Sequence, residues 1–390
     1  MTTPDPVALA QDLIRCPSVT PEEGGALTLM QSVLEAAGFA CHRLKFSEAG
    51  TPDVENLYAR FGSGSPHLCF AGHSDVVPPG DDAAWSHPPF AGDIVDGILY
   101  GRGAVDMKGA IACFTAAALG HLKERGRSAP GSISFLITGD EEGPSINGTA
   151  KVLKWLAARG ERLDAAILGE PTSVERVGDE LKIGRRGSLN IDLLVSGKQG
   201  HSAYAHLAEN PIPKLARLID RLSTTRLDAG SAHFEPSSIE ATVISVPNRA
   251  SNVIPSEARA KINIRYNDLW TRDRVEARVR EVCAEAAREV GARYALSFES
   301  TGDVFLSKGG PLVSTVIEAV AAVTGTAPRL STGGGTSDAR FIHSYCPVVE
   351  LGLVNKTIHQ VDENTPVRDL ERMTEIYAMV LKRYFGAAGA

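Results

Sequence analysis

The stretch Gly72-His73-Ser74-Asp75-Val76-Val77-Pro78 directly follows a short apolar run, residues 67–71, and this junction decides the fold. A run of that kind predicts a buried strand. His73 and Asp75 stand two residues apart, so their side chains point the same way from an extended backbone. An imidazole is a good zinc ligand, and a neighbouring carboxylate can orient it. Alone, the pair is more typical of a surface or capping role, so its meaning depends on the rest of the chain.

Acidic and histidine side chains stand next to several further apolar runs. Three consecutive carboxylates follow one strand-like run, and a glutamate follows another. An aspartate precedes an apolar helix, and a histidine comes after a last strand-like run. In a parallel sheet, residues that follow the strands meet at the same edge. The groups gathered in this way are His73, Asp75, Asp106, Glu141, Glu142, Glu170 and His359.

Each of these residues has a simpler explanation when taken alone. Asp106 stands where a helix N-cap would, and aspartate is common there. Consecutive carboxylates are tolerable on a solvated loop, whereas an enclosed loop needs a cation to compensate them. Seven such residues at one sheet edge are not expected by chance, so together they predict a metal site. Nitrogen and oxygen donors without sulfur suit zinc, with cobalt or manganese as substitutes, and one bridging carboxylate could hold two ions about 3.5–4 Å apart.

The order of the expected elements indicates an α/β fold with a central, mostly parallel sheet. An insertion, residues 183–297, follows a β-α-β-β-α-β order, which matches the α+β, ferredoxin-like motif. The sequence thus predicts two domains, residues 1–182 with 298–390, and the inserted 183–297. The expected helices cover 5–15, 25–38, 110–122, 148–159, 211–228, 271–290, 311–324 and 366–385, and the expected strands include 56–61, 67–71, 132–138, 164–168, 191–196, 238–246, 257–266, 294–299 and 347–351.

Composition argues against several classes of protein. Lys and Arg number 40 against 47 Asp and Glu, a formal net charge of −7, and no basic stripe stands out. Nucleic acid and anionic membranes are therefore not expected as partners. We expect no signal peptide, because the N-terminal stretch lacks a basic segment followed by an apolar core, and no run is long enough to span a bilayer. Six scattered cysteines without a C-x-x-C pair fit a reducing cytoplasm.

Eight motifs together resemble those of the dinuclear-zinc deacylase and peptidase superfamily, which includes aminoacylases, acetylornithine deacetylase and carboxypeptidase G. They extend over most of the chain. Two positions depart from the usual pattern, Ser74 in place of Thr and Ala205 in place of Pro, and neither should bind metal. The motifs are GHSDVVP (72–78), YGRGAVDMKG (100–109), TGDEEG (138–143), GEPT (169–172), GRRGSL (184–189), GKQGHSAYAH (197–206), STGGGTSDARF (331–341) and NKTIHQVDE (355–363).

The resemblance implies a zinc-hydrolase-type catalytic domain with two zinc ions and a role for each clustered residue. His73 and Glu170 would hold one ion, Glu142 and His359 the other, and Asp106 would bridge them. Asp75 would bond to His73 and set its tautomer. Glu141 would stay off the ions as the general base that takes a proton from the attacking water and passes it to the leaving amine.

Residues outside this cluster fit a small anionic substrate. Guanidinium forks match carboxylates, so Arg185 and Arg186 suit such a substrate, although both could be ordinary exposed arginines. The run Gly333-Gly334-Gly335 lacks the Lys-Ser/Thr ending of a phosphate-binding loop, so nucleotide binding is not expected, and close backbone approach to the substrate is its expected use. The resemblance implies substrate contacts from Arg185, Ser188, Asn252, Gly335, Thr336 and Asn355.

His201 lies in a Gly-flanked loop of the inserted domain. It could be an ordinary loop histidine, or it could donate to the oxyanion formed during amide hydrolysis. In the superfamily the equivalent histidine reaches the active site of the partner subunit. The resemblance therefore implies a homodimer in which the insertion serves as a dimerisation (lid) domain.

The activity that the resemblance implies is hydrolysis of an N-acyl-amino acid. Within the superfamily, the motifs are most similar to those of enzymes that remove a succinyl group from a diamino acid. Acetylornithine or another N-acyl-amino acid is the alternative substrate. The alternative of another class is a non-catalytic binding protein on this fold, which the presence of Glu141 and all five proposed metal ligands disfavours.

Overall fold

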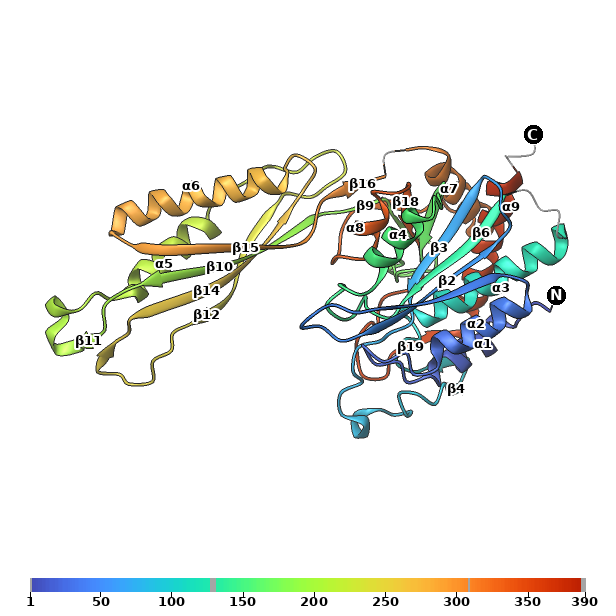
Figure 1. Ribbon diagram of the computed structural model, residues 1–390, viewed down its shortest axis with the longest axis horizontal. Coiled ribbons are helices and arrows are strands. Elements are labelled where there is room, and N and C mark those ends of the chain that lie inside the picture. Colours follow the sequence, from blue (N-terminus) through green and yellow to red (C-terminus); the bar gives the residue numbers. More distant parts are fainter. Residues whose placement is uncertain (1, 127–130, 308, 387–390) are drawn as a thin grey trace. The chain divides into compact units, whose positions relative to one another are not determined.

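The structure is a computed structural model that describes residues 2–126, 131–307 and 309–386 (Figure 1). The chain divides into two compact units. The first comprises Met1–Ile183, Ser307–Ser331 and Ser337–Ala390, and the second comprises Gly184–Leu306 and Thr332–Thr336. The predicted boundary at residue 297 falls inside a strand, because β15 (Arg293–Gly302) continues past it.

An eight-stranded sheet forms the centre of the first unit. Four neighbouring strands, β6, β3, β7 and β18, are parallel, whereas β1 and β2 run antiparallel at one edge. The predicted mostly parallel sheet is thus confirmed. In spatial order the strands are β1 (Ala40–Phe46), β2 (Val54–Phe61), β6 (Ser132–Thr138), β3 (His67–His73), β7 (Ala165–Leu168), β18 (Val348–Glu350), β8 (Glu180–Lys182) and β17 (Arg329–Ser331).

Helices cover this sheet on both faces, which explains why its inner strands are buried along their whole length. All seven residues of β3 and all seven of β6 are buried. The long helices α3 (Lys108–Arg125) and α9 (Val367–Gly386) pack against each other. Helices α1 (Pro6–Ile14), α2 (Ala26–Ala36), α4 (Thr149–Ala158), α7 (Pro311–Thr324) and the short α8 (Ala339–Ile342) complete the layers.

Aromatic side chains join the sheet to these helices. Phe70 of β3 stacks on Phe114 of α3 with ring centroids 4.4 Å apart. Phe135 of β6 meets Phe114 edge-on at 5.5 Å, and Tyr377 of α9 meets it at 5.4 Å. The Tyr377 hydroxyl donates to the carbonyl of Leu351. This cluster fixes the strands whose ends carry the polar groups.

A small three-stranded sheet lies in the same unit and connects two distant segments. It consists of β4 (Ile94–Val95), β5 (Ile98–Tyr100) and β19 (Asn364–Pro366), with β5 in the middle. Strands β4 and β5 pair antiparallel and form a hairpin. Because β19 immediately follows the segment that contains His359, its pairing with β5 ties that segment to the YGRG stretch.

The second unit has the expected β-α-β-β-α-β order and a four-stranded antiparallel sheet. Both helices and the sheet share one apolar core. Helix α5 ends at Ser223, short of the predicted residue 228, where the Thr224 and Thr225 hydroxyls bond back to helix carbonyls. The sheet order is β12 (Ser238–Ser245), β14 (Glu257–Tyr266), β10 (Gly187–Ser196) and β15, and the helices are α5 (Pro211–Ser223) and α6 (Arg272–Val290).

Short elements complete the second unit. Strands β11 (Gly200–His201) and β13 (Val253–Ile254) pair with each other, a 3-10 helix spans Ser202–Leu207, and β9 (Gly184–Arg185) pairs with β16 (Phe305–Leu306). Across both units, none of the helices in the described residues is long and apolar enough to cross a membrane.

Candidate metal centre

The strand ends of the first unit carry the groups that the sequence singled out. β3 ends at His73, the carboxylates of Glu141 and Glu142 follow β6, and Glu170 follows β7. These three strands are parallel neighbours, so their carboxyl ends lie at one edge of the sheet. Asp106 comes just before α3, but the N-cap residue of that helix is Met107 and no side chain caps it. The helix-cap explanation of Asp106 is therefore wrong.

His73 is held in one tautomer by its own strand end. Its Nδ1 lies 2.9 Å from the backbone carbonyl of Asp75. A carbonyl only accepts hydrogen bonds, so Nδ1 carries the proton of the neutral ring. The other nitrogen, Nε2, lies 3.0 Å from Oδ1 of Asp106 and 3.8 Å from Oε1 of Glu170. The basic lone pair of the imidazole is thus directed toward two buried carboxylates, as a metal ligand requires.

Asp106 lies between the two imidazoles and offers one oxygen to each. Its Oδ1 faces Nε2 of His73 at 3.0 Å, and its Oδ2 faces Nε2 of His359 at 3.2 Å. The same His359 nitrogen lies 2.8 Å from Oε1 of Glu142. A carboxylate with its two oxygens turned to two separate ligand sets has the arrangement of a bridge between two ions.

Two triads in the described residues have the spacing of metal ligands. One atom each from His73, Asp106 and Glu142 lie within 4.8 Å of one another, and so do atoms from His73, Glu141 and Glu170. Glu141 therefore lies within ligand distance of the cluster.

Asp75 contacts its neighbours differently from the expectation. Its carboxylate lies 3.8 Å from Nδ1 of His73, beyond hydrogen-bonding distance, and the backbone carbonyl makes that contact instead. The carboxylate accepts the backbone N–H of Glu142 at 3.0 Å and that of Glu141 at 3.4 Å. Asp75 is fully buried. It thus orients His73 through its main chain, and through its side chain it fixes the loop at residues 140–143, here called the DEEG loop.

The ionisation of the cluster reflects crowding of like charges in a buried place. Burial, followed by the charge of Glu170, raises the pKa of Glu141 well above its ordinary value. Burial also raises the pKa of Asp106, but hydrogen bonds from His359 and His73 outweigh it and hold that pKa well below normal. The hydrogen bonds with Asp106 and Glu142 raise the pKa of His359 to about 10.

This donor set fits divalent cations. Five carboxylates, those of Asp75, Asp106, Glu141, Glu142 and Glu170, gather around the imidazoles of His73 and His359. Even with both rings protonated, the carboxylates outnumber the positive charges. A buried excess of negative charge is costly unless a cation compensates it. Nitrogen and oxygen donors without thiolate suit zinc, cobalt or manganese.

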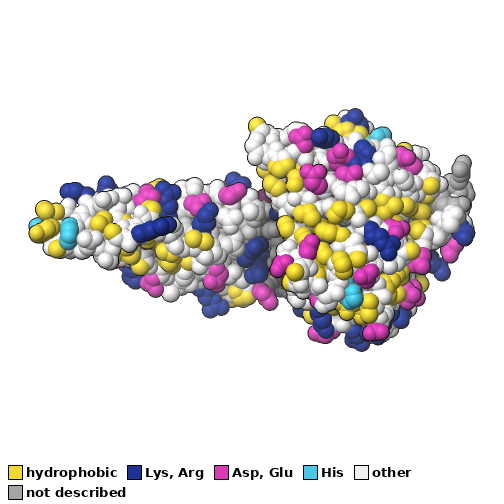
Figure 2. Space-filling view, turned by 90° about the horizontal axis from the view of Figure 1, so that it is seen from below, with side chains coloured by type: hydrophobic (Ala, Val, Ile, Leu, Met, Phe, Trp, Pro, Cys, Tyr) yellow, Lys and Arg dark blue, Asp and Glu magenta, His cyan; other side chains and the backbone are white. Residues whose placement is uncertain are grey.

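Two further predicted site residues, His201 and Asn252, lie on neighbouring segments of the second unit. His201 pairs with Val253 across β11 and β13, and Ser202 donates to the carbonyl of Asn252 at 2.9 Å. Nδ1 of His201 accepts the backbone N–H of Ala203 at 3.0 Å. The proton of the neutral ring is therefore on Nε2, which leaves His201 an outward donor. Exposed histidine and hydrophobic side chains are visible at this end of the unit (Figure 2).

A second group in this unit gathers around Arg185 and Ser188. Nη1 of Arg185 donates to the carbonyl of Gly335 at 2.9 Å, which places the glycine-rich loop beside β9. Ser188 is paired with Arg265 across β10 and β14. The Ser188 hydroxyl accepts from Asn263, which in turn accepts from Arg265. Thr336 follows Gly335 in the same unit, whereas Asn355 belongs to the first unit.

Arg265 and Asn263 were missed from the sequence. Burial lowers the pKa of Arg265, and the charges of Arg186 and Arg185 lower it further, so three guanidinium groups lie near one another. A signal was available, because residues 261, 263 and 265 are polar and alternate with Ile262 and Ile264. Such alternation puts the polar side chains on one face of the strand.

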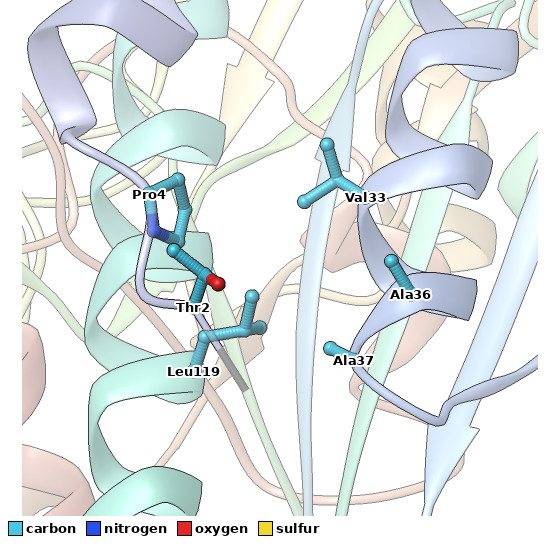
Figure 3. Close-up of a pocket in the computed structure, with 6 residues that line it drawn as sticks. All are labelled: Thr2, Pro4, Val33, Ala36, Ala37 and Leu119. Carbon is cyan, nitrogen blue, oxygen red and sulfur yellow. The ribbon is translucent and has the colours of Figure 1, made fainter.

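An apolar pocket elsewhere in the first unit is separate from the candidate centre. The N-terminal segment, α2 and α3 form it (Figure 3). Its lining residues are Thr2, Pro4, Val33, Ala36, Ala37 and Leu119. None of these side chains is acidic, basic or a metal ligand, so the pocket adds nothing to the chemistry of the strand ends.

Sequence comparisons relate the chain to known hydrolases. Residues 69–383 match the profile of peptidase family M20/M25/M40. A succinyl-diaminopimelate desuccinylase of Rhodopseudomonas palustris (strain TIE-1) is 56% identical over 384 residues, which cover 98% of this chain and 99% of that protein. A protein of the same name from Rhodospirillum centenum is 56% identical over 385 residues, covering 99% and 98%.

Solved structures share the fold at low sequence identity. An M20 family metallo-carboxypeptidase from Sulfolobus solfataricus superposes with a TM-score of 0.78 at 18% identity, covering 98% of this chain and 99% of the other. A dinuclear metal-binding peptidase of the M20 family from Bacillus subtilis gives a TM-score of 0.70 at 17% identity, covering 96% of each chain. These likenesses concern the architecture of the whole chain.

Proposed function

The chain belongs to peptidase family M20/M25/M40, and on that basis we propose that it hydrolyses N-succinyl-LL-2,6-diaminopimelate to succinate and LL-2,6-diaminopimelate. This reaction serves lysine biosynthesis by the diaminopimelate pathway. The proposal is supported by the identity to desuccinylases over almost the full length. The structural observation that carries it is Asp106, whose two oxygens face Nε2 of His73 at 3.0 Å and Nε2 of His359 at 3.2 Å.

The proposed cofactor is a pair of zinc ions, for which cobalt or manganese could substitute. His73 and Glu170 would hold one ion, Glu142 and His359 the other, and Asp106 would contact both. When bound, such ions lower the pKa of water toward neutrality and polarise the carbonyl of the scissile amide. The tautomer of His73 supports this assignment, because its Nε2 is the nitrogen free to bind.

Glu141 is the proposed general base. Its raised pKa supports the role, because a carboxylate that holds a proton more readily can accept one from water and release it to the leaving amine. The backbone N–H of Glu141 lies 3.4 Å from the carboxylate of Asp75. Asp75 therefore positions the base as well as His73. The amide C–N bond breaks as the water oxygen joins the carbonyl carbon, and the amine departs with the transferred proton.

Recognition of the substrate is assigned to polar groups that are not proposed metal ligands. A succinylated diamino acid carries several carboxylates, which guanidinium groups bind well. Arg185, Ser188 and Asn252 of the second unit are proposed to contact these carboxylates, and the missed Arg265 joins them. Gly335, Thr336 and Asn355 are proposed to complete the contacts, and His201 would donate from Nε2 to the developing oxyanion.

We further propose that the protein is a cytoplasmic homodimer joined through the second unit, with the first unit as the catalytic domain. Strand β12 is an edge strand of its sheet, and Val243 and Ile244 on it are 46% and 64% exposed. An edge strand with exposed apolar side chains can pair with another chain. Tyr204 and Leu207, near His201, are also strongly exposed.

All six cysteines are unpaired, which supports a reducing compartment.

A substrate panel with metal analysis tests the proposed function. The zinc-loaded protein should hydrolyse N-succinyl-LL-2,6-diaminopimelate faster than acetylornithine or other N-acyl-amino acids. Rapid turnover of acetylornithine without turnover of the succinyl compound would overturn the substrate assignment. Failure to hydrolyse any acyl-amino acid with two ions bound would favour a binding protein on this fold.

A further inference from the structure

A buried ion pair lies directly behind the candidate metal centre. Arg102 is 2% exposed and Glu363 is fully buried. Nη1 of Arg102 donates to Oε2 of Glu363 across 2.7 Å. Both side chains bond to the main chain of candidate ligands, Glu363 to that of Asp106 and Arg102 to that of His359. The pair thus contacts the backbone of the two segments that carry those ligands.

Glu363 binds the backbone of the Asp106 segment. Its second oxygen, Oε1, accepts the N–H of Val105 at 2.9 Å and the N–H of Asp106 at 3.1 Å. One carboxylate therefore fixes two consecutive peptide groups at the residue whose oxygens face both imidazoles. Because carboxylates are acceptors only and can take several hydrogen bonds, a neutral side chain of the same shape could not keep all of these contacts.

Arg102 binds the backbone of the His359 segment. Nη1 also donates to the carbonyl of Gln360 at 3.2 Å, and Nη2 contacts the carbonyl of His359 at 3.5 Å. The guanidinium is packed 5.1 Å from the ring centre of Trp85. His359 has a φ of +59°, in the left-handed region that non-glycine residues rarely adopt. A backbone in that conformation persists only when its surroundings hold it there.

We propose that Arg102 and Glu363 are positioning residues, a clamp that sets the distance between Asp106 and His359 and thereby the site of the ion that these two residues share with Glu142. This inference rests on the proposed function only in taking that cluster as a metal centre. Its support is the direction of the hydrogen bonds, because Nη1 and Nη2 of Arg102 and Oε1 of Glu363 all bond to the backbone of ligand-bearing segments. Buried ion pairs add little to stability compared with apolar packing, so geometry is the advantage of a charged pair here.

The same unit contains a matched ion pair without this role. Arg60 pairs with Glu161, which also accepts from the Tyr58 hydroxyl, and Arg60 donates to the hydroxyl of Ser132. Both charged side chains are about one-fifth exposed. Glu161 also lies 3.9 Å from Nδ1 of His67, but this contact is at the beginning of β3, whereas the candidate ligand His73 ends that strand. Glu161→Gln therefore breaks an ion pair in the first unit without touching the clamp.

The test compares Glu363→Gln with Glu161→Gln in the full-length protein. Zinc affinity is measured by competition with a chelator, the absorption spectrum is recorded with cobalt bound, and thermal unfolding is followed without metal. We expect Glu363→Gln to weaken one of the two ions by about 10- to 100-fold and to alter the cobalt bands. Glu161→Gln should keep both affinities and the spectrum even if its unfolding temperature falls.

Two results would overturn the clamp: wild-type affinity for both ions in Glu363→Gln, or an equal loss of affinity in Glu161→Gln. If Glu363→Gln does not fold, Arg102→Lys decides the question, since lysine keeps the charge but lacks the planar fork. That variant should also lose affinity for one ion, and unchanged affinity would reject the proposal. Because the measurements need no substrate, they stand apart from the substrate assignment, which would fail if the metal-loaded wild type left the succinyl compound intact.

Discussion

The Nδ1 of His73 donates to the backbone carbonyl of Asp75 across 2.9 Å. A main-chain acceptor cannot ionise, so this bond keeps a proton on Nδ1 and fixes the orientation of the ring, whether or not Nε2 also carries a proton. Nε2 is thereby kept directed toward Asp106 and Glu170. Asp75 can then use its carboxylate for a different purpose, which is to accept the backbone N–H groups of the DEEG loop.

Replacing Glu141 with Gln should remove the proton acceptor and leave the ligands in place. Glutamine has nearly the same shape but cannot take a proton from water. We expect kcat to fall by about 100- to 10,000-fold, the usual contribution of a positioned general base, with unchanged metal content. Steady-state kinetics and metal analysis of the same preparation check this. Normal activity in the variant would exclude Glu141 as the base.

Replacing Asp106 with Asn should disrupt both halves of the centre. One oxygen becomes an amide NH₂, which cannot serve as a ligand, so one of the two contacts, at 3.0 and 3.2 Å, is lost. We expect the metal content to fall from two ions to one or fewer and hydrolysis to be lost. Elemental analysis after dialysis measures the first effect. Two tightly held ions in the variant would contradict a bridging role.

Metal affinity should rise with pH. In the metal-free protein, the Asp106 and Glu142 contacts raise the pKa of His359 to about 10. Burial lowers the pKa of His73, but its hydrogen bond and charge interaction with Asp106 outweigh burial and raise that pKa. Both rings thus hold a proton near neutrality that a cation must displace.

Calorimetry in buffers with different ionisation enthalpies measures this proton release. Between pH 6.5 and 8.5 we expect release of about one to two protons on zinc binding, and an affinity that weakens as the pH falls. The sign follows from the direction of the shifts, because a raised pKa means that protons compete with the cation over this whole range. Affinity independent of pH would show that the imidazoles are not ligands.

Replacing Arg265 with Gln should weaken substrate binding without weakening the fold. The nearby charges of Arg185 and Arg186 disfavour the Arg265 cation in the absence of substrate, so its removal relieves repulsion. We expect kcat/KM to fall by roughly 10- to 100-fold, as for the loss of a charged hydrogen bond, mainly through KM. Thermal unfolding should show equal or greater stability. A stability loss with unchanged KM would assign Arg265 a purely structural role.

Replacing Phe114 with Ala should destabilise the first unit. Its ring is fully buried, stacks on Phe70 and meets Phe135 and Tyr377 edge-on. Deletion of a buried Phe side chain costs about 3–5 kcal/mol. Denaturant unfolding of the metal-free protein measures the change. A loss below about 1 kcal/mol would mean that the sheet and α3 close the cavity, contrary to the tight packing seen here.

The sequence predicted the parts of the fold that repeat a simple pattern. Apolar runs followed by acidic or histidine residues marked β3, β6 and β7, because buried strands and their carboxyl ends are local features. Strand β1 was missed, since it is an edge strand whose residues are half-buried or exposed and lack a clean alternation. The end of β15 was placed too early, because its pairing with β10 continues past the predicted end at residue 299 to Gly302.

Contacts between distant residues were harder to predict. The approach of Asp75 to the DEEG loop and of Glu363 to the Asp106 segment depends on how separate strands and loops meet. A residue type says what a side chain can bond, but not which of several backbone groups it will find. Arg265 was missed although a local signal was available, since the alternation of polar and apolar residues in its strand indicates which face it occupies.

The order of the ligands along the chain has a consequence for biosynthesis. Six of the seven clustered residues precede the second unit, whereas His359 follows it. A ribosome must therefore complete the whole insertion before the last imidazole emerges. Until then, the acidic cluster lacks one of its two imidazoles, so the proposed ion that His359 would hold could bind only after that residue has been synthesised.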